Sequence, residues 1–349
     1  MIIHIFEDTP HHYLNMRKFF LEYCSYKGLE QCFWAKSPSK GIPLDGFSYY
    51  KNTQELKRKL YKKNNDASVL IHGSFEVRTW LMLLLHRNTS QMSYVFWGAE
   101  LYRYQMENIT VKQKLIQLMH RALCKRINKV ICLNSGDAVL VDKYLKRNDA
   151  IVLPYPIQGI DLDKLSCMPD KPINTGTLRL LVGNSASPSN NHISVLKQLE
   201  KYAGEDIRVI CTLNYAGPQD YIDDVIAHGR KSFGEKFEAI TEMLTKQQHN
   251  QLIESVDACI FSHDRQQGLF VVYAMFAYGK AVFMKRKITS FSFLTELGFS
   301  LNETDNIDGL NWQDFLLLIS LKTNNLALLK NTLSEEALAP QWIKLMKNL

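Results

Sequence analysis

Short apolar runs alternate with longer amphipathic stretches through the first half of the chain. The runs are rich in β-branched and aromatic residues and are bounded by Gly, Asn, Asp or Pro, which predicts strands. They cover residues 2–6, 29–34, 69–72, 94–97, 130–133 and 151–153. Between them, apolar positions recur at helical spacing in residues 13–26, 53–63, 75–87, 111–126 and 135–144. Strands that alternate with helices predict a parallel sheet covered on both faces.

A second alternation of the same kind follows a break at Pro154-Tyr155-Pro156. Strands are expected at residues 178–182, 207–211, 236–240, 258–261 and 281–283. Helices are expected at residues 190–202, 219–232, 246–255, 269–278, 290–297 and throughout 312–349. The resulting division is a first domain of residues 1–156, a linker 157–176, a second domain 177–335, and a C-terminal helix 336–349 that packs back on the first domain. Two consecutive Rossmann-like α/β domains, with parallel sheets facing across a cleft, form the architecture called GT-B.

Composition and charge narrow the class of protein. Of the 349 residues, 46% are hydrophobic and 22% are charged, as in globular proteins. The seven scattered cysteines form no CxxC pair, so we expect thiols in a reducing, cytoplasmic setting. Residues 1–156 carry 23 Lys and Arg against 13 Asp and Glu, whereas the remainder carries 19 against 22. This asymmetry indicates that the first domain faces a polyanion, either nucleic acid or an anionic membrane surface.

Two loops of the second domain follow predicted strands and begin predicted helices. In the first, Gly183 allows a sharp turn, and Ser189 or Asn190 can cap the helix. In the second, Arg265 offers a fork of donors suited to phosphate, and Gln266 and Gln267 can bind sugar hydroxyls. A pyrophosphate fits this edge, where open α/β sheets bind ligands. An ordinary capped turn and a solvated loop remain the alternatives.

Polar side chains at the corresponding edge of the first domain are candidate acid–base groups. They are Glu7, Asp8, His11, His12, His72 and Glu100. Asp161 and Asp163 resemble a metal-binding DxD motif, but their place in the linker indicates surface charge, and no other metal-ligand spacing occurs. We therefore expect no metal and no cofactor.

The sequence resembles the family of TDP-N-acetylfucosamine:lipid II N-acetylfucosaminyltransferases (4-alpha-L-fucosyltransferases, glycosyltransferase family 56). The resemblance is carried, in the family's order and spacing, by short motifs up to about residue 290. They are Pro10-His-His12, Ile71-His-Gly73, Trp97-Gly-Ala99, Leu101-Tyr102, Val182-Gly-Asn-Ser185, Ser189-Asn190, His192-Ile193 and Arg265-Gln-Gln-Gly268. Two positions depart from the family: Glu100 replaces its Asp, and the basic residue after Pro156 is missing.

The resemblance implies a GT-B enzyme that transfers 4-acetamido-4,6-dideoxygalactose from a dTDP donor to a glycan on undecaprenyl pyrophosphate, without a metal. A related nucleotide deoxysugar, used for O-antigen or capsule, is the alternative. Its partners would be the dTDP-sugar, the polyprenyl-linked acceptor and the anionic inner face of the plasma membrane. The donor-side residues are Gly183, Asn184, Ser185, Ser189, Asn190, His192, Tyr215, Arg265, Gln266, Gln267 and Gly268.

The acceptor hydroxyl needs a base, and Glu100 is the first choice because nearby Trp97 could exclude water and raise its pKa. His11 and His12 are the next candidates, and Asp8, His72 and Trp97 are expected on the acceptor side. The basic helix over residues 53–63 is expected to contact the membrane. Its cationic residues are Lys57, Arg58, Lys59, Lys62 and Lys63.

Two functions from other classes fit the sequence less well. A nucleic-acid-binding protein would explain the basic first domain, but no recognised nucleic-acid module is present. A nucleotide-sugar epimerase or dehydrogenase would need a dinucleotide fingerprint after residues 2–6, and none is there. We therefore expect no nucleic-acid partner.

Overall fold

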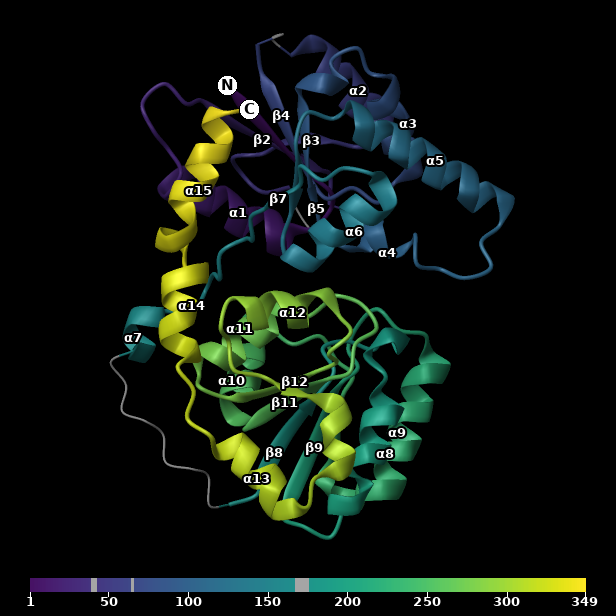
Figure 1. Ribbon diagram of the computed structural model, residues 1–349, viewed down its shortest axis with the longest axis vertical. Coiled ribbons are helices and arrows are strands. Elements are labelled where there is room, and N and C mark those ends of the chain that lie inside the picture. Colours follow the sequence, from purple (N-terminus) through teal and green to yellow (C-terminus); the bar gives the residue numbers. More distant parts are fainter. Residues whose placement is uncertain (39–42, 64–65, 167–175) are drawn as a thin grey trace. The chain divides into compact units, whose positions relative to one another are not determined.

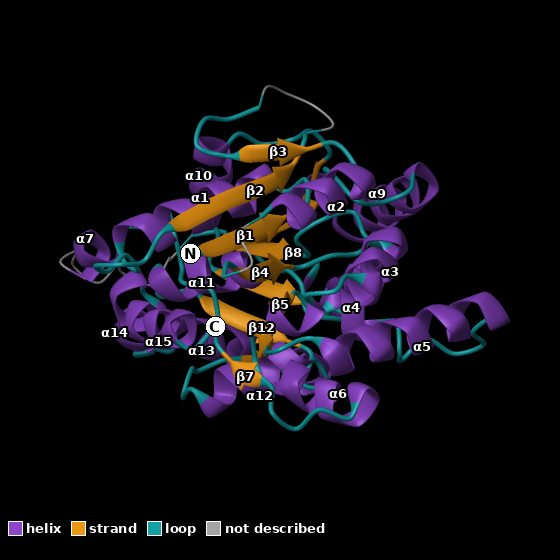
Figure 2. Ribbon diagram, turned by 90° about the horizontal axis from the view of Figure 1, so that it is seen from above, coloured by secondary structure: helices purple, strands orange, loops and turns teal. Residues whose placement is uncertain are grey.

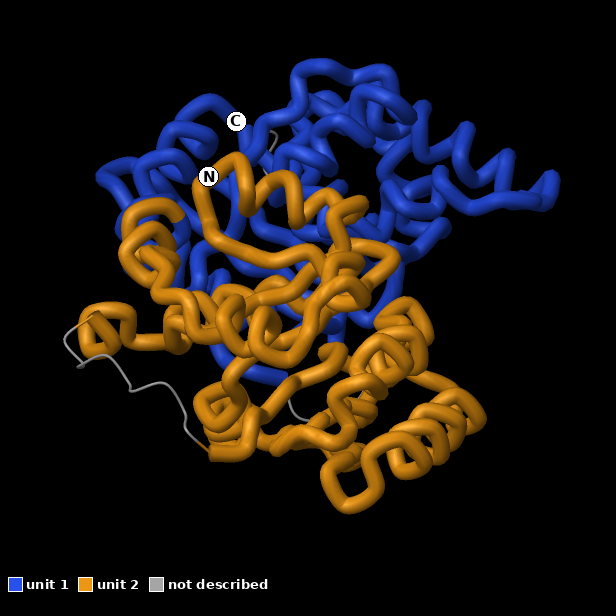
Figure 3. Tube along the Cα trace, turned by 60° about the horizontal axis from the view of Figure 1, so that its bottom comes forward, with its two compact units in different colours: residues 1–158, 333–349 blue, residues 159–332 orange. Residues whose placement is uncertain are grey.

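The chain folds into two compact units. The computed structural model describes residues 1–38, 43–63, 66–166 and 176–349. The first unit comprises residues 1–158 and 333–349, and the second comprises residues 159–332 (Figure 3). The segment expected to be a linker, 157–176, therefore divides between the two units. Its only described helix, α7 (Leu162–Ser166), lies in the second unit, and residues 167–175 lie outside the described part.

The first unit is built on a seven-stranded parallel sheet with the order β3-β2-β1-β4-β5-β6-β7. Figure 2 shows β3, β2, β1, β4 and β5 side by side and pointing the same way. The strands are β1 (Ile2–Phe6), β2 (Gln31–Lys36), β3 (Ser48–Tyr50), β4 (Ser68–His72), β5 (Met92–Phe96), β6 (Val130–Cys132) and β7 (Ile151–Val152). All residues of β1 and β5 are buried, as a sheet covered on both faces requires.

Helices and one 3₁₀ turn connect these strands. They are α1 (Pro10–Glu22), α2 (Thr53–Lys62), α3 (Val77–Leu85), η1 (Thr89–Gln91), α4 (Ala99–Tyr102), α5 (Val111–Arg126) and α6 (Ser135–Leu145). Side-chain caps fix where several of them begin. Asn52 caps α2, Asn134 caps α6, and Thr110 forms a capping box with Gln113 at the start of α5.

The last helix, α15 (Glu335–Lys347), packs on the first unit, although the second unit precedes it in the chain. Trp342 is fully buried and its indole N–H donates to the Pro154 carbonyl at 3.0 Å. Its ring lies 5.2 Å from that of Phe20 and 5.7 Å from that of Tyr155. The C-terminal helix is thus part of the core of the first unit.

The second unit repeats the design with a six-stranded parallel sheet in the order β10-β9-β8-β11-β12-β13. Its strands are β8 (Leu178–Val182), β9 (Ile207–Thr212), β10 (Phe237–Ile240), β11 (Ala258–Phe261), β12 (Ala281–Met284) and β13 (Asn302–Glu303). Its further α-helices are α8 (His192–Leu199), α9 (Gln219–Phe233), α10 (Lys246–Ser255), α11 (Leu269–Ala277), α12 (Thr289–Glu296), α13 (Trp312–Ser320) and α14 (Asn325–Leu333) (Figure 1). Its 3₁₀ turns are η2 (Pro188–Asn190), η3 (Glu200–Tyr202), η4 (Gly234–Lys236) and η5 (Thr304–Gly309).

Candidate active site

Both sheets reverse their strand order at one place, where open α/β sheets bind ligands. In the first unit the reversal lies between β1 and β4, and in the second between β8 and β11. Asp8 follows β1 and His72 ends β4, whereas Gly183 follows β8 and Arg265 follows β11. The residues expected to carry chemistry therefore gather at the switch point of each sheet.

The loop after β8 is shaped by Gly183 and Asn190. Gly183 has φ +69°, and a Cβ there would lie 2.2 Å from Nε2 of His192, so only glycine fits. Asn190 is fully buried, and its Oδ1 accepts a hydrogen bond from the Asn184 backbone N–H at 2.9 Å. Its Nδ2 donates to Ser185 Oγ at 3.2 Å. Asn190 thus holds the loop in one shape.

The two predicted loops of the second unit are joined across the switch point. Ser189 Oγ donates to Gln267 Oε1 at 3.3 Å, and the Asp264 N–H donates to the Ser189 carbonyl at 3.0 Å. Asn184 Nδ2 also donates to the hydroxyl of Tyr215, which is 47% exposed. The residues expected to bind the donor, far apart in sequence, therefore form one surface.

Several buried polar atoms of this surface have no hydrogen-bond partner among the described residues. They are Asn184 Oδ1, His192 Nε2 and Gln267 Nε2. An unpaired buried polar group costs about 1–3 kcal/mol, so such a cluster suits a site that a polar ligand completes. Burial lowers the pKa of His192 to about 4, and its ring is therefore neutral at physiological pH.

An anion fits at the start of α11. Gly268 precedes the helix with φ +69°, and a Cβ there would meet Asn184 Cγ at 3.0 Å. The first N–H groups of a helix and its dipole favour negative charge. Arg265 lies three residues before Gly268, is partly exposed, and makes no hydrogen bond or ion pair within the described ranges. These groups together suit a diphosphate.

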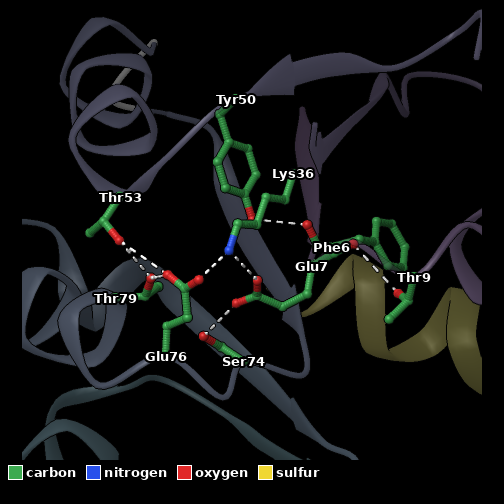
Figure 4. A network of polar contacts seen from close by, with 9 residues as sticks. All are labelled: Phe6, Glu7, Thr9, Lys36, Tyr50, Thr53, Ser74, Glu76 and Thr79. Atoms are coloured by element: carbon green, nitrogen blue, oxygen red, sulfur yellow. Dashed lines mark hydrogen bonds and ion pairs between the residues drawn. The ribbon is translucent and has the colours of Figure 1, made fainter. Parts of the chain in front are cut away.

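A network of carboxylates surrounds Lys36 at the switch point of the first unit (Figure 4). Ser74 Oγ donates to Glu7 Oε1 at 3.0 Å, and Lys36 Nζ lies 3.9 Å from Glu7 Oε2. Lys36 also pairs with Glu76, whose other oxygen accepts from Thr79 at 3.4 Å. The Glu7 side chain is 13% exposed, and burial raises its pKa.

Glu100, the first choice for the base, is fully buried. Its carboxylate accepts from the backbone N–H of Ser74 at 3.4 Å and of Trp97 at 3.2 Å. It also accepts from the Tyr94 hydroxyl at 3.3 Å. Burial raises its pKa to about 7. In this arrangement Glu100 ties the loops after β4 and β5 together and does not reach the surface, which suits positioning better than proton transfer from an acceptor.

His72, expected on the acceptor side, is also fully buried, and it belongs to a chain of hydrogen bonds. The Trp97 indole N–H donates to the Tyr155 hydroxyl at 3.2 Å, and this hydroxyl lies 2.6 Å from His72 Nδ1. His72 Nε2 lies 3.0 Å from Nδ1 of His4. Sequence reasoning missed His4 and Tyr155, because each sits in a run read only as strand or chain break.

The hydrogen bonds of Gln31, at the end of this series opposite Trp97, determine which atom donates in each hydrogen bond. Gln31 Nε2 donates to the Phe20 carbonyl at 3.0 Å, so Gln31 Oε1 accepts from His4 Nε2 at 3.1 Å. The indole N–H of Trp97 can only donate. Each imidazole must therefore carry its proton on Nε2. Burial lowers the pKa of His4 to about 3 and that of His72 below its usual range, so both rings are neutral.

An aromatic wall lies beside the carboxylates. The ring of Trp97 lies 4.9 Å from that of His12 and 6.0 Å from that of Phe75, which is 38% exposed. Gly73 makes room for it, because a Cβ there would lie 2.6 Å from the indole. Aromatic faces of this kind suit a sugar ring. The side chain of His11 lies outside the part of the chain that the structure describes.

The cations of the basic helix α2 and the two linker aspartates either have ordinary partners or are exposed. Lys59 Nζ donates to Ser48 Oγ and to the Tyr49 carbonyl, and Lys63 Nζ donates to the Ala67 carbonyl at 2.6 Å. Lys57, Arg58 and Lys62 are exposed. In the second unit, Asp161 accepts from the Lys164 N–H at 2.8 Å and Asp163 pairs with Lys330, as expected of surface charge.

Solved structures with low sequence identity share this fold. A UDP-forming alpha,alpha-trehalose-phosphate synthase from Burkholderia vietnamiensis matches with a TM-score of 0.71 and 9% identity, covering 100% of both chains. An E. coli structure described as trehalose-6-phosphate bound with UDP-2-fluoro glucose matches at 0.70 and 10% identity, covering 100% of this chain and 99% of the other. A Rickettsia africae glycosyltransferase matches at 0.65 and 12% identity, covering 99% and 97%. The two units therefore have the GT-B fold, as the sequence predicted.

The sequence itself identifies the family. Residues 1–310 match the family described as 4-alpha-L-fucosyltransferase, glycosyl transferase group 56. The match spans both units and includes the two switch-point loops of each. The chain belongs to this family of glycosyltransferases.

Proposed function

We propose that the protein is an inverting glycosyltransferase for surface polysaccharide synthesis. It transfers 4-acetamido-4,6-dideoxygalactose, or a related deoxysugar, from a dTDP donor to a glycan on undecaprenyl pyrophosphate. Family membership supports a sugar transferase, and the identity of the sugar and acceptor is our proposal. Another nucleotide deoxysugar, destined for O-antigen or capsule, is the alternative donor.

The observation that carries the proposal is the surface at the β8–β11 switch point. Three unpaired buried polar atoms, the start of α11 and the Arg265 guanidinium all lie in its two joined loops or in the first residues of the helices that follow them. The helix N-terminus and Arg265 would neutralise the diphosphate as it leaves. We therefore propose that transfer requires no metal, and that turnover persists in excess EDTA. Loss of turnover that Mn²⁺ restores would contradict this.

The acceptor would bind at the first unit. We propose Glu7 as the base, because its carboxylate is partly exposed at the β1–β4 switch point and burial raises its pKa above the ordinary value of a glutamate. Ser74 and Lys36 orient it. Glu100 and His72 position the loops, Asp8 and Trp97 flank the acceptor, and His12 is the second candidate for the base.

A direct transfer assay tests the proposal. The full chain would be incubated with a short-chain polyprenyl-pyrophosphate glycan and either the dTDP-linked or a UDP-linked acetamidosugar. We expect the product mass to increase by one acetamidodideoxyhexose residue with the dTDP donor, and no comparable product with the UDP donor. Transfer from UDP-sugars alone would overturn the dTDP assignment and leave the enzyme class intact.

A further inference from the structure

Helix α5 exposes a row of apolar side chains. Val111, Leu115 and Leu118 are 75%, 61% and 57% exposed, and their spacing places them along one face of the helix. Met106, just before the helix, is 56% exposed. Figure 1 shows α5 extending outward from the sheet of the first unit. Exposed rows of this kind mark interaction surfaces.

A groove of about 330 Å³ continues this row between α5 and the end of α6. Its apolar floor and cationic rim are formed by Leu118, Ala122, Tyr144 and Leu145 and by Arg121, Lys125, Lys143 and Lys146. Among the described residues that line it, none is acidic. Arg121 Nε donates to the Tyr144 carbonyl at 2.9 Å, whereas the three rim lysines are exposed. The groove thus offers fixed and free positive charge around an apolar floor.

The same helix carries further cations. Lys112 and Lys114 flank the apolar row, and no Asp or Glu occurs between Val111 and Arg126. A helix with an apolar face beside Lys and Arg lies in the plane of a membrane interface. Helix α2 differs, because its apolar residues Leu56 and Leu60 are buried in the core.

We propose that α5 and the adjoining groove bind an anionic phospholipid surface. The apolar row enters the boundary between headgroups and acyl chains, while the lysines contact lipid phosphates. A nucleic acid would use the cations but leave the apolar row in water. The inference rests on the proposed function only in that a lipid-linked acceptor requires an enzyme at the membrane.

Sedimentation with vesicles tests this directly. The full chain would be mixed at low salt with phosphatidylglycerol vesicles, with phosphatidylcholine vesicles and with duplex DNA. We expect binding to the anionic vesicles, which high salt weakens. The triple substitution Val111→Ser, Leu115→Ser and Leu118→Ser should weaken vesicle binding by about tenfold or more. All three side chains are exposed, so the fold should survive.

A matched pair of charge variants locates the surface. Replacing Lys112, Lys125 and Lys146 by Gln removes three charges from the proposed surface. Replacing Lys57, Arg58 and Lys62 by Gln removes three exposed charges from α2. The first variant should weaken vesicle binding by about a hundredfold at low salt, and the second by much less.

Several results would overturn the inference. They are absence of vesicle binding by the parent, undiminished binding by the serine variant, equal loss in the two charge variants, or DNA binding that exceeds vesicle binding. Sedimentation needs no substrate, and dTDP affinity should be equal in the parent and all three variants. A chain that binds vesicles but not dTDP would contradict the proposed function and leave the membrane surface standing.

Discussion

At the scale of single residues, the sequence predicts that polar side chains at the ends of strands are candidate site residues. It does not predict the role of each of them. Glu7, Asp8, His72 and Glu100 all follow or end strands, as the sequence predicted. Which of them reaches the surface depends on side-chain contacts between loops far apart in sequence. Glu100 turns inward to three donors, whereas Glu7 stays partly exposed. No local pattern encodes that difference.

The proposed base gives the first prediction. Glu7→Gln is nearly isosteric, so it should leave dTDP affinity intact and lower kcat by about 100-fold or more. Because burial raises the pKa of Glu7, the acidic limb of the kcat profile should lie above the usual range of a glutamate. Glu22→Gln, on the exposed side of α1, is the control. Near-normal kcat in the Glu7 variant would transfer the role to His12.

The buried carboxyl of Glu100 predicts a dependence of stability on pH. Its folded-state pKa of about 7 lies above the ordinary 4.5. Glu100 therefore contributes stability that is fully present below about pH 4.5 and is lost as pH rises through about 7. The loss is at most about 3 kcal/mol. Denaturant unfolding of Glu100→Gln should show a smaller decline between pH 5 and 8 than the parent, and parallel declines would contradict the assignment.

The series of hydrogen bonds from Trp97 to Gln31 predicts which nitrogen of each histidine is protonated. It also predicts how much the free energy of unfolding falls when the series is broken. NMR of ¹⁵N-labelled histidine should find His4 and His72 neutral and protonated on Nε2. Tyr155→Phe leaves the Trp97 N–H and His72 Nδ1 without partners, so it should lower the free energy of unfolding by about 1–3 kcal/mol. Tyr61→Phe, whose side chain is 42% exposed, should change it little. Equal free energies of unfolding in the two variants would show that this series of hydrogen bonds does not contribute to stability.

At the scale of elements, the bounds predicted from the sequence agree with the structure for three buried strands, residues 2–6, 178–182 and 258–261, and for two capped helices. Residues 111–126 and 246–255 were predicted with the bounds observed, and each begins with a capping box, at Thr110 and Thr245. The edge strands β3 and β13 were missed, because three and two residues are too few to show alternation. Helix α1 begins three residues earlier than expected, at Pro10, which a helix accepts in its first turn.

The turn after β8 gives a prediction at this scale. Gly183→Ala combines an unfavourable φ with a clash against His192, so it should distort the loop and weaken dTDP binding by about tenfold or more. Gly204→Ala is the matched control, because a Cβ there meets nothing within 4 Å. Calorimetry of both variants with dTDP checks this. Unchanged affinity in the Gly183 variant would show that the loop does not bind the donor.

At the scale of the whole molecule, the repeated α/β pattern predicted two Rossmann-like domains, and the short motifs predicted the family. The residues at the two switch points differ in kind. The first has carboxylates and an aromatic wall, and the second has the unpaired polar atoms and the helix start at which we propose that the diphosphate binds. The excess positive charge lies in residues 1–156, but the row of exposed apolar side chains beside it is on α5 rather than on the basic helix α2 that the sequence singled out. The apolar residues Leu56 and Leu60 of α2 are buried, whereas the apolar row of α5 is exposed, and the sequence does not reveal this difference.

The most direct test of the account is calorimetric titration of dTDP and thymidine into the parent, Arg265→Ala and Arg286→Ala. Arg286 follows the neighbouring strand β12 and is 72% exposed, so its removal takes the same charge from the same sheet edge. A charge-assisted contact to phosphate predicts a loss of about 1.5–3 kcal/mol for dTDP in Arg265→Ala, little loss for thymidine, and little change in Arg286→Ala. Equal losses for both ligands, or equal effects of the two substitutions, would contradict a diphosphate site at the β8–β11 switch point.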